Sequence, residues 1–222
     1  KAVNNIKSSL PEEIPLIGFC GSPWTLAAYS IEGRSSKDFE KTLGFLESNQ
    51  KDVHDLLIKY TDACFLYLRK QVQSGADVIQ IFDSWANLLT KEDLIEFSFN
   101  YINSLISALK LDPITKNIPV IIFARNPKCN IEELINTSAD CISLFWSMNN
   151  LNFEVAKNKV AIQGNLDPKI LLESDETIKR ETYKILERFK EYPGYIFNLG
   201  HGITPDISPD KIKYLTNIVR EY

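Results

Sequence analysis

The sequence has few of the residues that build metal and redox centres. Its 222 residues include only two histidines and four cysteines, and no cysteine belongs to a CxxC or CxH pair. Zinc sites and dithiol redox centres use such short spacings. We therefore expect no metal site, and we interpret the cysteines as buried free thiols of a reducing compartment. They are Cys20, Cys64, Cys129 and Cys141.

The chain also lacks long apolar segments and a strong charge of either sign. No apolar run approaches the roughly 20 residues of a membrane-spanning helix, and we expect no signal peptide. The formal net charge of −4 argues against a groove that binds nucleic acid through its phosphates. We therefore expect neither a membrane nor a nucleic acid as a partner. The first residue is Lys1 rather than methionine, which indicates a processed or shortened chain.

Glycine-rich phosphate-binding turns are absent as well. With only nine glycines, the chain contains neither GxGxxG nor GxxxxGK[ST]. A doubly wound nucleotide-binding sheet usually carries such a turn after its first strand. The residues therefore offer no support for a nucleotide site.

Six short apolar runs recur along the chain and predict the strands of a sheet. They are rich in isoleucine, valine and phenylalanine, and they do not alternate between polar and apolar residues. Strands covered on both faces, as in a parallel sheet, have this pattern. The predicted strands are 16–20, 78–82, 120–124, 141–146, 160–163 and 195–199.

Amphipathic helical patterns lie between these runs. Apolar residues recur at three- and four-residue spacing over 53–67, 94–109, 178–189 and 212–219. Asp175 is placed to cap the third of these helices, and Ser208 with Pro209 to open the last. This alternation of strand and helix predicts an α/β fold. Two architectures are open at this point, a doubly wound sheet and a (β/α)8 barrel.

The segment GFCGSPWTLAAYSIEG, residues 18–33, shows how a helix follows the first strand. Ser22 suits the N-cap, and Pro23 suits the first helical position. Gly33 can end the helix in a left-handed conformation. The helix thus places Tyr29 a short distance past the strand end.

Polar residues follow successive predicted strands, and this distribution favours the barrel. Barrel enzymes build their sites at the carboxyl ends of the strands. Six strands are two short of closure, however, which predicts two exposed hydrophobic sheet edges. The polar residues are Tyr29, Asp83, Ser84, Arg125, Asn126, Asn165, Asp167, Asn198 and His201.

Four segments resemble those of the uroporphyrinogen decarboxylases. They are PLIGFCGSPWTLAAYSIEG, QVQSGADVIQIFDSWANLL, VAIQGNLDP and YIFNLGHGITPD, in the order and with the spacing of that family, and VIIFARN fits the strand between the second and third. The resemblance extends from about Ile14 to the C-terminus. It implies an α/β fold of the (β/α)8 TIM-barrel type. About six of the eight βα units lie in this chain, so residues 1–222 are expected to form a single, incomplete barrel domain.

The resemblance also implies an activity. Members of the family remove carbon dioxide from the four acetate arms of uroporphyrinogen and leave methyl groups in coproporphyrinogen, with neither a metal nor an organic cofactor. They are usually homodimers, and a cytoplasmic location, or a plastid one, fits a haem-pathway enzyme. In the family an aspartate in the barrel centre binds the pyrrole N–H groups, and arginines near the amino end contact substrate carboxylates. Both belong to the first two barrel strands, and no stretch of this chain matches them.

Five residues match functional positions of the family. Tyr29 matches a tyrosine that hydrogen-bonds the substrate, and Ser84 matches a polar residue that faces it. His201 lies between two glycines, which allow close approach of a ligand, and its imidazole can be cationic or donate when neutral. The resemblance implies that these three are catalytic and also bind substrate, while Phe19 and Phe82 line the cleft.

From the residues alone, most of these positions have a plainer interpretation. Tyr29 can pack one face of an amphipathic helix. Ser84 can cap a helix, a task that Asp83 can also serve. Phe19 and Phe82 can be ordinary core residues of strands.

Other positions match the family less well or carry no clear role. Arg125 can meet a propionate arm or remain solvated, and we interpret His54, on the long helix, as structural. Phe145 stands where the family usually has an acidic residue before tryptophan. Arg34 replaces a glycine-like position after IEG.

There are three alternatives to this activity, and the residues argue against the second. Zinc methyltransferases that act on corrinoid or methionine systems share this fold relation, but they need a cluster such as HxC, and His201 is followed by Gly202 and Ile203. Barrel aldolases need a Schiff-base lysine at a strand end, where the predicted strands have none. The third is a catalytically silent barrel fragment without the ring-binding aspartate. We expect little activity from the chain alone and recovery when about 130 upstream residues, roughly two βα units with insertions, are restored.

Overall fold

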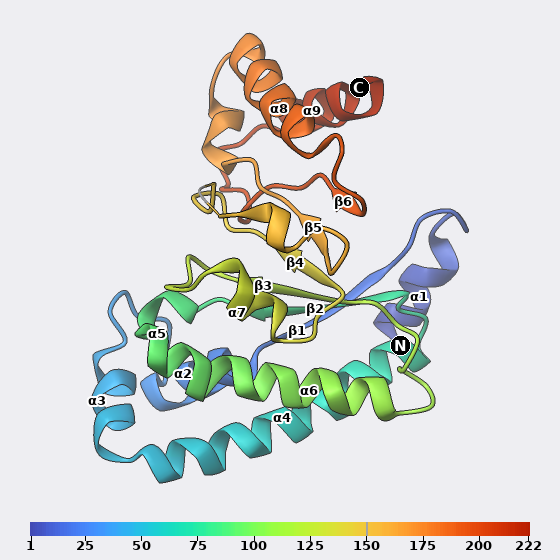
Figure 1. The fold of residues 1–222 in the computed structure, drawn as a ribbon. Coiled ribbons are helices and arrows are strands. Elements are labelled where there is room, and N and C mark those ends of the chain that lie inside the picture. The colour runs from blue at the N-terminus through green and yellow to red at the C-terminus, as the bar shows by residue number, and fades with distance from the viewer. Residues whose placement is uncertain (150) are drawn as a thin grey trace.

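The computed structural model describes residues 1–149 and 151–222, and its six strands confirm the α/β barrel-type fold (Figure 1). All neighbouring strands are parallel, and their spatial order is the order of the sequence. A doubly wound sheet would reverse its strand order at a switch point, whereas a barrel does not. The strands are β1 (Ile17–Gly21), β2 (Val78–Asp83), β3 (Val120–Ala124), β4 (Cys141–Ser143), β5 (Ala161–Gln163) and β6 (Tyr195–Ile196).

Two strands end earlier than the apolar runs predicted, and β5 begins one residue later, at Ala161. The prediction extended β4 to Trp146 and β6 to Leu199, but these strands end at Ser143 and Ile196, and an isolated parallel bridge joins Leu199 to Leu166. After β4 the chain makes one more ladder contact, from Leu144 N to Gln163 O, and then turns. Leu144 and Phe145 stay buried without strand pairing. An apolar run therefore predicted burial here but not the end of the ladder.

The longer helices pack on the outside of the strands. Helix α4 contacts β1, α2 and α6, and α4 and α6 together cover the lower side of the sheet in Figure 1. Helices α8 and α9 pair with each other beyond β6. The α-helices are α1 (Ala2–Ser9), α2 (Pro23–Glu32), α3 (Glu40–Ser48), α4 (Gln50–Gln73), α5 (Lys91–Asp93), α6 (Asn100–Leu111), α7 (Ile131–Ile135), α8 (Asp175–Phe189) and α9 (Pro209–Glu221).

Four short helical turns complete the fold. The π-helix η2 (Leu94–Phe99) precedes α6, so the helical pattern predicted over 94–109 is not one uniform α-helix. The 3-10 turns are η1 (Ala86–Leu88), η3 (Phe153–Val155) and η4 (Pro168–Leu172).

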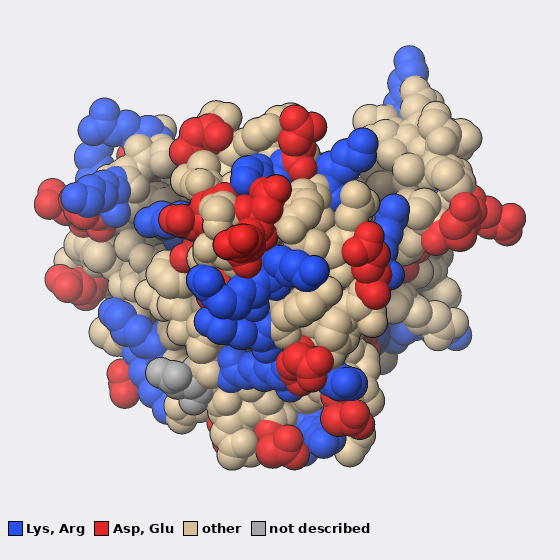
Figure 2. All heavy atoms as spheres, turned by 90° about the horizontal axis from the view of Figure 1, so that it is seen from above, with Lys and Arg blue, Asp and Glu red and all other residues tan. Residues whose placement is uncertain are grey.

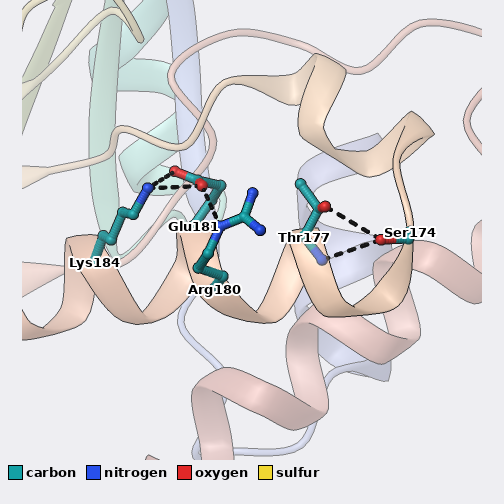
Figure 3. Close-up of polar contacts among 5 residues, drawn as sticks. All are labelled: Ser174, Thr177, Arg180, Glu181 and Lys184. Carbon is teal, nitrogen blue, oxygen red and sulfur yellow. Dashed lines mark hydrogen bonds and ion pairs between the residues drawn. The ribbon is translucent and has the colours of Figure 1, made fainter.

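The predicted helix ends are confirmed with one exception. Ser22 Oγ accepts from the Thr25 amide at 3.0 Å, and Gly33 ends α2 at φ 80°. For α8 the prediction of Asp175 as N-cap is wrong, because Ser174 accepts from the Thr177 amide (Figure 3). A serine hydroxyl on extended backbone does this as well as a carboxylate.

The outer edge of β1 is covered in part, contrary to the expectation of two bare edges. Gln71 on α4 accepts from the amide of Phe19 at 2.9 Å and donates to its carbonyl at 2.8 Å. A Cβ on Gly18 would lie 2.6 Å from Gln71 Oε1, so the missing side chain makes room for this contact. The side chain thus takes a hydrogen-bonding position that a further strand would occupy.

Two apolar clusters hold the chain together. The larger lies between the strands and helices α2, α4 and α6. The smaller joins α8 and α9 to the loops after β5 and β6, and it includes Leu166, Ile207 and Leu215. The smaller cluster therefore holds both ends of the segment that carries His201.

The structure confirms most of what the sequence predicted for the cysteines. All four cysteines are free, and three are buried, whereas Cys129 is only partly buried. Burial raises the pKa of Cys129 and of Cys141 to about 12. Acidic and basic side chains are interspersed on the face drawn in Figure 2. No helix among the described residues is long and apolar enough to cross a membrane.

The cap of α8 can be tested by substitution. Ser174→Ala removes the acceptor for the Thr177 amide, and we expect the free energy of unfolding to fall by about 1 kcal/mol in urea denaturation. Ser174→Asp keeps an acceptor and should stay within about 0.5 kcal/mol of the wild type. Equal losses in the two variants would contradict the assigned cap.

Candidate active site

A row of aromatic rings runs across the carboxyl ends of the first strands. Phe82 and Phe123 are register partners on β2 and β3, with ring centroids 5.8 Å apart. Phe19 on β1 meets Phe82 edge-on at 5.8 Å, and Phe145 continues the row at 6.4 Å from Phe123. The rings form an apolar surface at the end of the sheet where a barrel builds its site.

An open hollow of about 430 Å³ lies over this row and brings three predicted residues together. Phe82, Ser84 and His201 all line it, although His201 is more than a hundred positions from the other two. Its lining also includes Gln80, Phe123, Ser143, Asn198 and Leu199. Hydroxyl, amide and imidazole groups therefore face the same space as the aromatic rings.

Phe19 lies beside this hollow rather than in the core. Its side chain is 61% exposed, so the interpretation as a core strand residue is wrong for Phe19. Phe19 faces the open side of β1, while its neighbours Gly18 and Cys20 face the helices. Phe82 is only partly buried.

Tyr29 does not line the hollow but contacts the segment that follows Ser84. Its ring lies 5.9 Å from Phe39 and 5.7 Å from Trp85, and 39% of the residue is exposed. Because Trp85 directly follows Ser84 in the chain, its contact with Tyr29 brings Tyr29 to the segment that carries Ser84. These contacts match the interpretation of Tyr29 as a packed residue of an amphipathic helix. The exposed part of its side chain leaves room for a ligand contact.

A buried carboxylate sets the position of Ser84. Asp83 is 1% exposed and accepts hydrogen bonds from Ser22 at 3.0 Å, Thr25 at 3.2 Å and Ser98 at 2.5 Å. Thr25 Oγ1 in turn accepts from the amide of Ser84 at 2.9 Å. Neither Asp83 nor Ser84 caps a helix, so that interpretation is wrong for both. The network leaves the Ser84 hydroxyl free to line the hollow.

Burial raises the pKa of Asp83 above its ordinary value, and the three hydroxyl donors oppose this rise. Desolvation disfavours the charged form of a carboxyl, whereas donated hydrogen bonds favour it. The net shift is upward because desolvation is the larger effect.

Close packing against Trp146 positions the loop that carries His201. A Cβ on Gly200 would lie 2.3 Å from Trp146 N and 2.6 Å from its Cα, so only glycine fits there. Gly202 has no such neighbour, and of the two flanking glycines only the first is required by packing. The His201 ring meets the edges of Phe123 at 6.2 Å and Phe145 at 5.9 Å.

The polar residues after β5 serve the structure and do not line the hollow. Asn165 is buried and donates to Phe145 O and Trp146 O at 3.3 and 3.4 Å. Asp167 accepts from the Lys169 amide at 3.0 Å and so begins η4. Asn165 thus supports the loop after β4, and Asp167 caps the turn η4.

Outside this site, His54 contacts Tyr101 at 2.7 Å and Glu96 at 3.3 Å on the outer helices. Arg125 and Asn126 follow β3, and the Arg125 amide donates to Asp83 O at 3.0 Å. Asn126 accepts from Ser147 at 3.1 Å, and the Arg125 guanidinium lies 5.4 Å from the Trp85 ring centre.

Several lining residues were not singled out from the sequence, among them Gln80, Phe123 and Ser143. Gln80 precedes Phe82 and Ser84 by two and four positions, so the alternation of a strand places all three on one face. A glutamine inside an apolar strand was a usable signal. Phe123 and Ser143 belong to fully buried runs, where the sequence does not mark the face that turns inward.

Comparison with known proteins identifies the family. The family model described as "Uroporphyrinogen decarboxylase (URO-D)" matches residues 1–222. The chain belongs to the uroporphyrinogen decarboxylase family. It is 41% identical over 223 residues to the uroporphyrinogen decarboxylase of Ruthia magnifica subsp. Calyptogena magnifica and 40% identical over 222 residues to that of Pseudoalteromonas atlantica. It spans 64% and 62% of the length of these relatives, and all of this chain is covered.

Solved structures support the barrel-type fold. A methyltransferase from Methanosarcina mazei superposes with a TM-score of 0.77 at 20% identity, over 99% of this chain and 62% of that one. A B12-independent methionine synthase from Shewanella sp. W3-18-1 gives 0.66 at 15% identity, over 99% and 66%. At these identities the likeness concerns the fold alone. Within residues 1–149 and 151–222, no three histidine, cysteine, aspartate or glutamate side chains could together hold a metal ion.

Gly200→Ala tests the packing of the His201 loop in this uroporphyrinogen decarboxylase family member. We expect a loss of about 1–3 kcal/mol in the free energy of unfolding, because the added methyl group meets backbone atoms. Gly202→Ala is the matched control and should change stability by less than about 0.5 kcal/mol. Urea denaturation measures both, and an unchanged Gly200→Ala would contradict the contact with Trp146.

Asp83→Asn tests the buried carboxyl through its pH dependence. The pKa of Asp83 is higher in the folded state than the ordinary 3.8, so its stabilising contribution is present below 3.8 and is lost as pH rises through the folded pKa. Asparagine does not titrate. We therefore expect the wild type to lose stability relative to Asp83→Asn as pH rises from about 4 towards neutrality, in urea unfolding at several pH values. A difference that does not vary with pH would refute the raised pKa.

Proposed function

We propose that this chain carries the substrate-facing strand ends of a uroporphyrinogen decarboxylase. The reaction removes carbon dioxide from the four acetate arms of uroporphyrinogen and yields coproporphyrinogen. The observation that carries the proposal is the hollow in which Phe82, Ser84 and His201 meet. Family membership over the full chain supports the same activity.

The reaction has three requirements, and the lining of the hollow can meet two of them. An apolar surface must hold the macrocycle, which suits the aromatic row of Phe19, Phe82 and Phe123. Donors must orient carboxylate arms, which suits the Ser84 hydroxyl and the His201 imidazole. The third need is an electron sink for the carbanion left at the acetate carbon, and a pyrrole ring protonated next to that carbon provides one.

The contacts to the reacting carboxylate must also suit its loss of charge during the reaction. The reacting carboxylate loses its charge as carbon dioxide leaves, so contacts that stabilise it strongly in the ground state would slow the step. The aromatic rings beside His201 would exclude water from part of that carboxylate. Single donors against an apolar surface therefore suit the reacting arm better than a tight ion pair.

The remaining parts of the proposal follow the family. An aspartate for the pyrrole N–H groups and arginines for carboxylates would come from barrel strands that no stretch of this chain matches. The reaction would use neither a metal nor an organic cofactor. The active protein would be a cytoplasmic homodimer with residues 1–222 as part of one barrel domain.

Turnover of freshly reduced uroporphyrinogen under anaerobic conditions tests the proposal. The chain is assayed alone and as a chimera that adds the part of the Ruthia magnifica decarboxylase not matched by it. We expect the chimera to form coproporphyrinogen and the chain alone to form little. In the chimera, His201→Ala should lower turnover by roughly 100-fold, the lower range for a residue acting on the transition state.

A control variant and a zinc measurement separate the outcomes. His54→Ala removes the other histidine, which lies outside the hollow, and should leave turnover within about threefold of the parent. A folded chimera without turnover, or with bound zinc on which activity depends, would refute the proposed function.

A further inference from the structure

We infer that Arg125 forms, with Ser84, a subsite that binds a propionate arm of the substrate. This inference rests on the proposed function, since it names the part of the porphyrinogen that the site would recognise. Arg125 is not among the residues that line the hollow, and its place follows from the strand register.

The register sets Arg125 beside Ser84. Phe82 pairs with Phe123, and Asp83 pairs with Ala124. The amide of Arg125 then donates to Asp83 O at 3.0 Å, which continues the ladder one step beyond the strands. Ser84 and Arg125 thus occupy the same level on neighbouring strand ends, each two residues past a phenylalanine of the aromatic row.

The guanidinium is held in place but has no anionic partner. It lies 5.4 Å from the ring centre of Trp85, within the range of a cation–π contact. Among the described residues, no carboxylate pairs with Arg125 and no acceptor takes a hydrogen bond from its side chain. A half-buried arginine with all its N–H donors unused is able to take a carboxylate through two parallel hydrogen bonds.

The surrounding contacts fix the aromatic plane below the guanidinium. Trp85 packs against Phe39 at 4.4 Å and Tyr29 at 5.7 Å. Ser84, one residue earlier, is fixed through Thr25. Serine hydroxyl and guanidinium are therefore presented from a supported segment, which lowers the entropy lost when an anion binds.

The charge that each arm carries during the reaction determines which arm the subsite binds. A guanidinium paired with the reacting acetate would stabilise the charged ground state more than the transition state and would oppose decarboxylation. A propionate arm keeps its charge throughout the reaction, so an ion pair there costs nothing in the chemical step. The four propionates are present in both uroporphyrinogen and coproporphyrinogen, whereas the acetates are present only in the former.

This difference between the two porphyrinogens provides the test. The dissociation constants of uroporphyrinogen and coproporphyrinogen are measured anaerobically with the 222-residue chain. We expect Arg125→Gln to weaken both by a similar factor of about ten, the scale of one partly exposed charge-assisted contact. Arg125→Lys keeps the charge but not the planar fork, and it should lose roughly threefold.

Lys128→Gln is the matched control, because Lys128 is an exposed cation three residues further on. It removes the same charge and should leave both dissociation constants within about twofold of the wild type. If Lys128→Gln weakens binding as much as Arg125→Gln does, the effect is general electrostatics and the subsite is refuted.

The other outcomes are equally decisive. Loss of affinity for uroporphyrinogen alone would assign Arg125 to an acetate arm and overturn the inference. Unchanged affinities in Arg125→Gln, or a wild-type chain that binds neither compound, would overturn it too. Turnover in the chimera would still uphold the proposed function in each of these cases, so the two failures can be told apart.

Discussion

The buried carboxyl of Asp83 ties the ends of the first two strands to the helices that cover them. It collects hydroxyl donors from Ser22 and Thr25 at the start of α2 and from Ser98 in η2. A buried carboxyl without such partners would destabilise the fold by several kcal/mol, so the three hydroxyls are required together. Because Thr25 also accepts from the Ser84 amide, the same cluster determines where the segment that lines the hollow begins.

The second fixed point of the site combines packing with backbone hydrogen bonds. Gly200 lies against the backbone of Trp146 and donates to Leu166 O at 2.8 Å, and the smaller apolar cluster holds the chain on both sides of His201. Ser84 is thus held by a polar network, and His201 by close contact and this backbone hydrogen bond, from parts of the chain far apart in sequence. The hollow depends on both, since its lining combines the end of β2 with the loop after β6.

Local features of this fold could be predicted, and features that depend on distant segments could not. The cap at Ser22, the end of α2 at Gly33 and the six strands follow from neighbouring residues and were confirmed. The exposure of Phe19 agrees with the cleft position that the resemblance implied, but it does not follow from the residues alone, because it depends on what faces β1 across the open side of the sheet. The pattern of the family pointed to Phe82, Ser84 and His201, while Gln80, Phe123 and Ser143 needed the register of the sheet.

Under the proposed function, different groups would hold the substrate and contact its reacting arm. Asp83 faces the helices and Arg125 follows the adjacent strand, so the charged groups lie behind or beside the aromatic row rather than within it. An arm that must lose its charge is best placed against apolar rings with single donors, and an arm that keeps its charge is best placed on a guanidinium. Strand alternation places Phe82 and Ser84 on one face of β2 and Asp83 on the other, whereas Arg125 follows the neighbouring strand β3. The two kinds of contact would thus come from neighbouring strand ends of one sheet, without a dedicated loop.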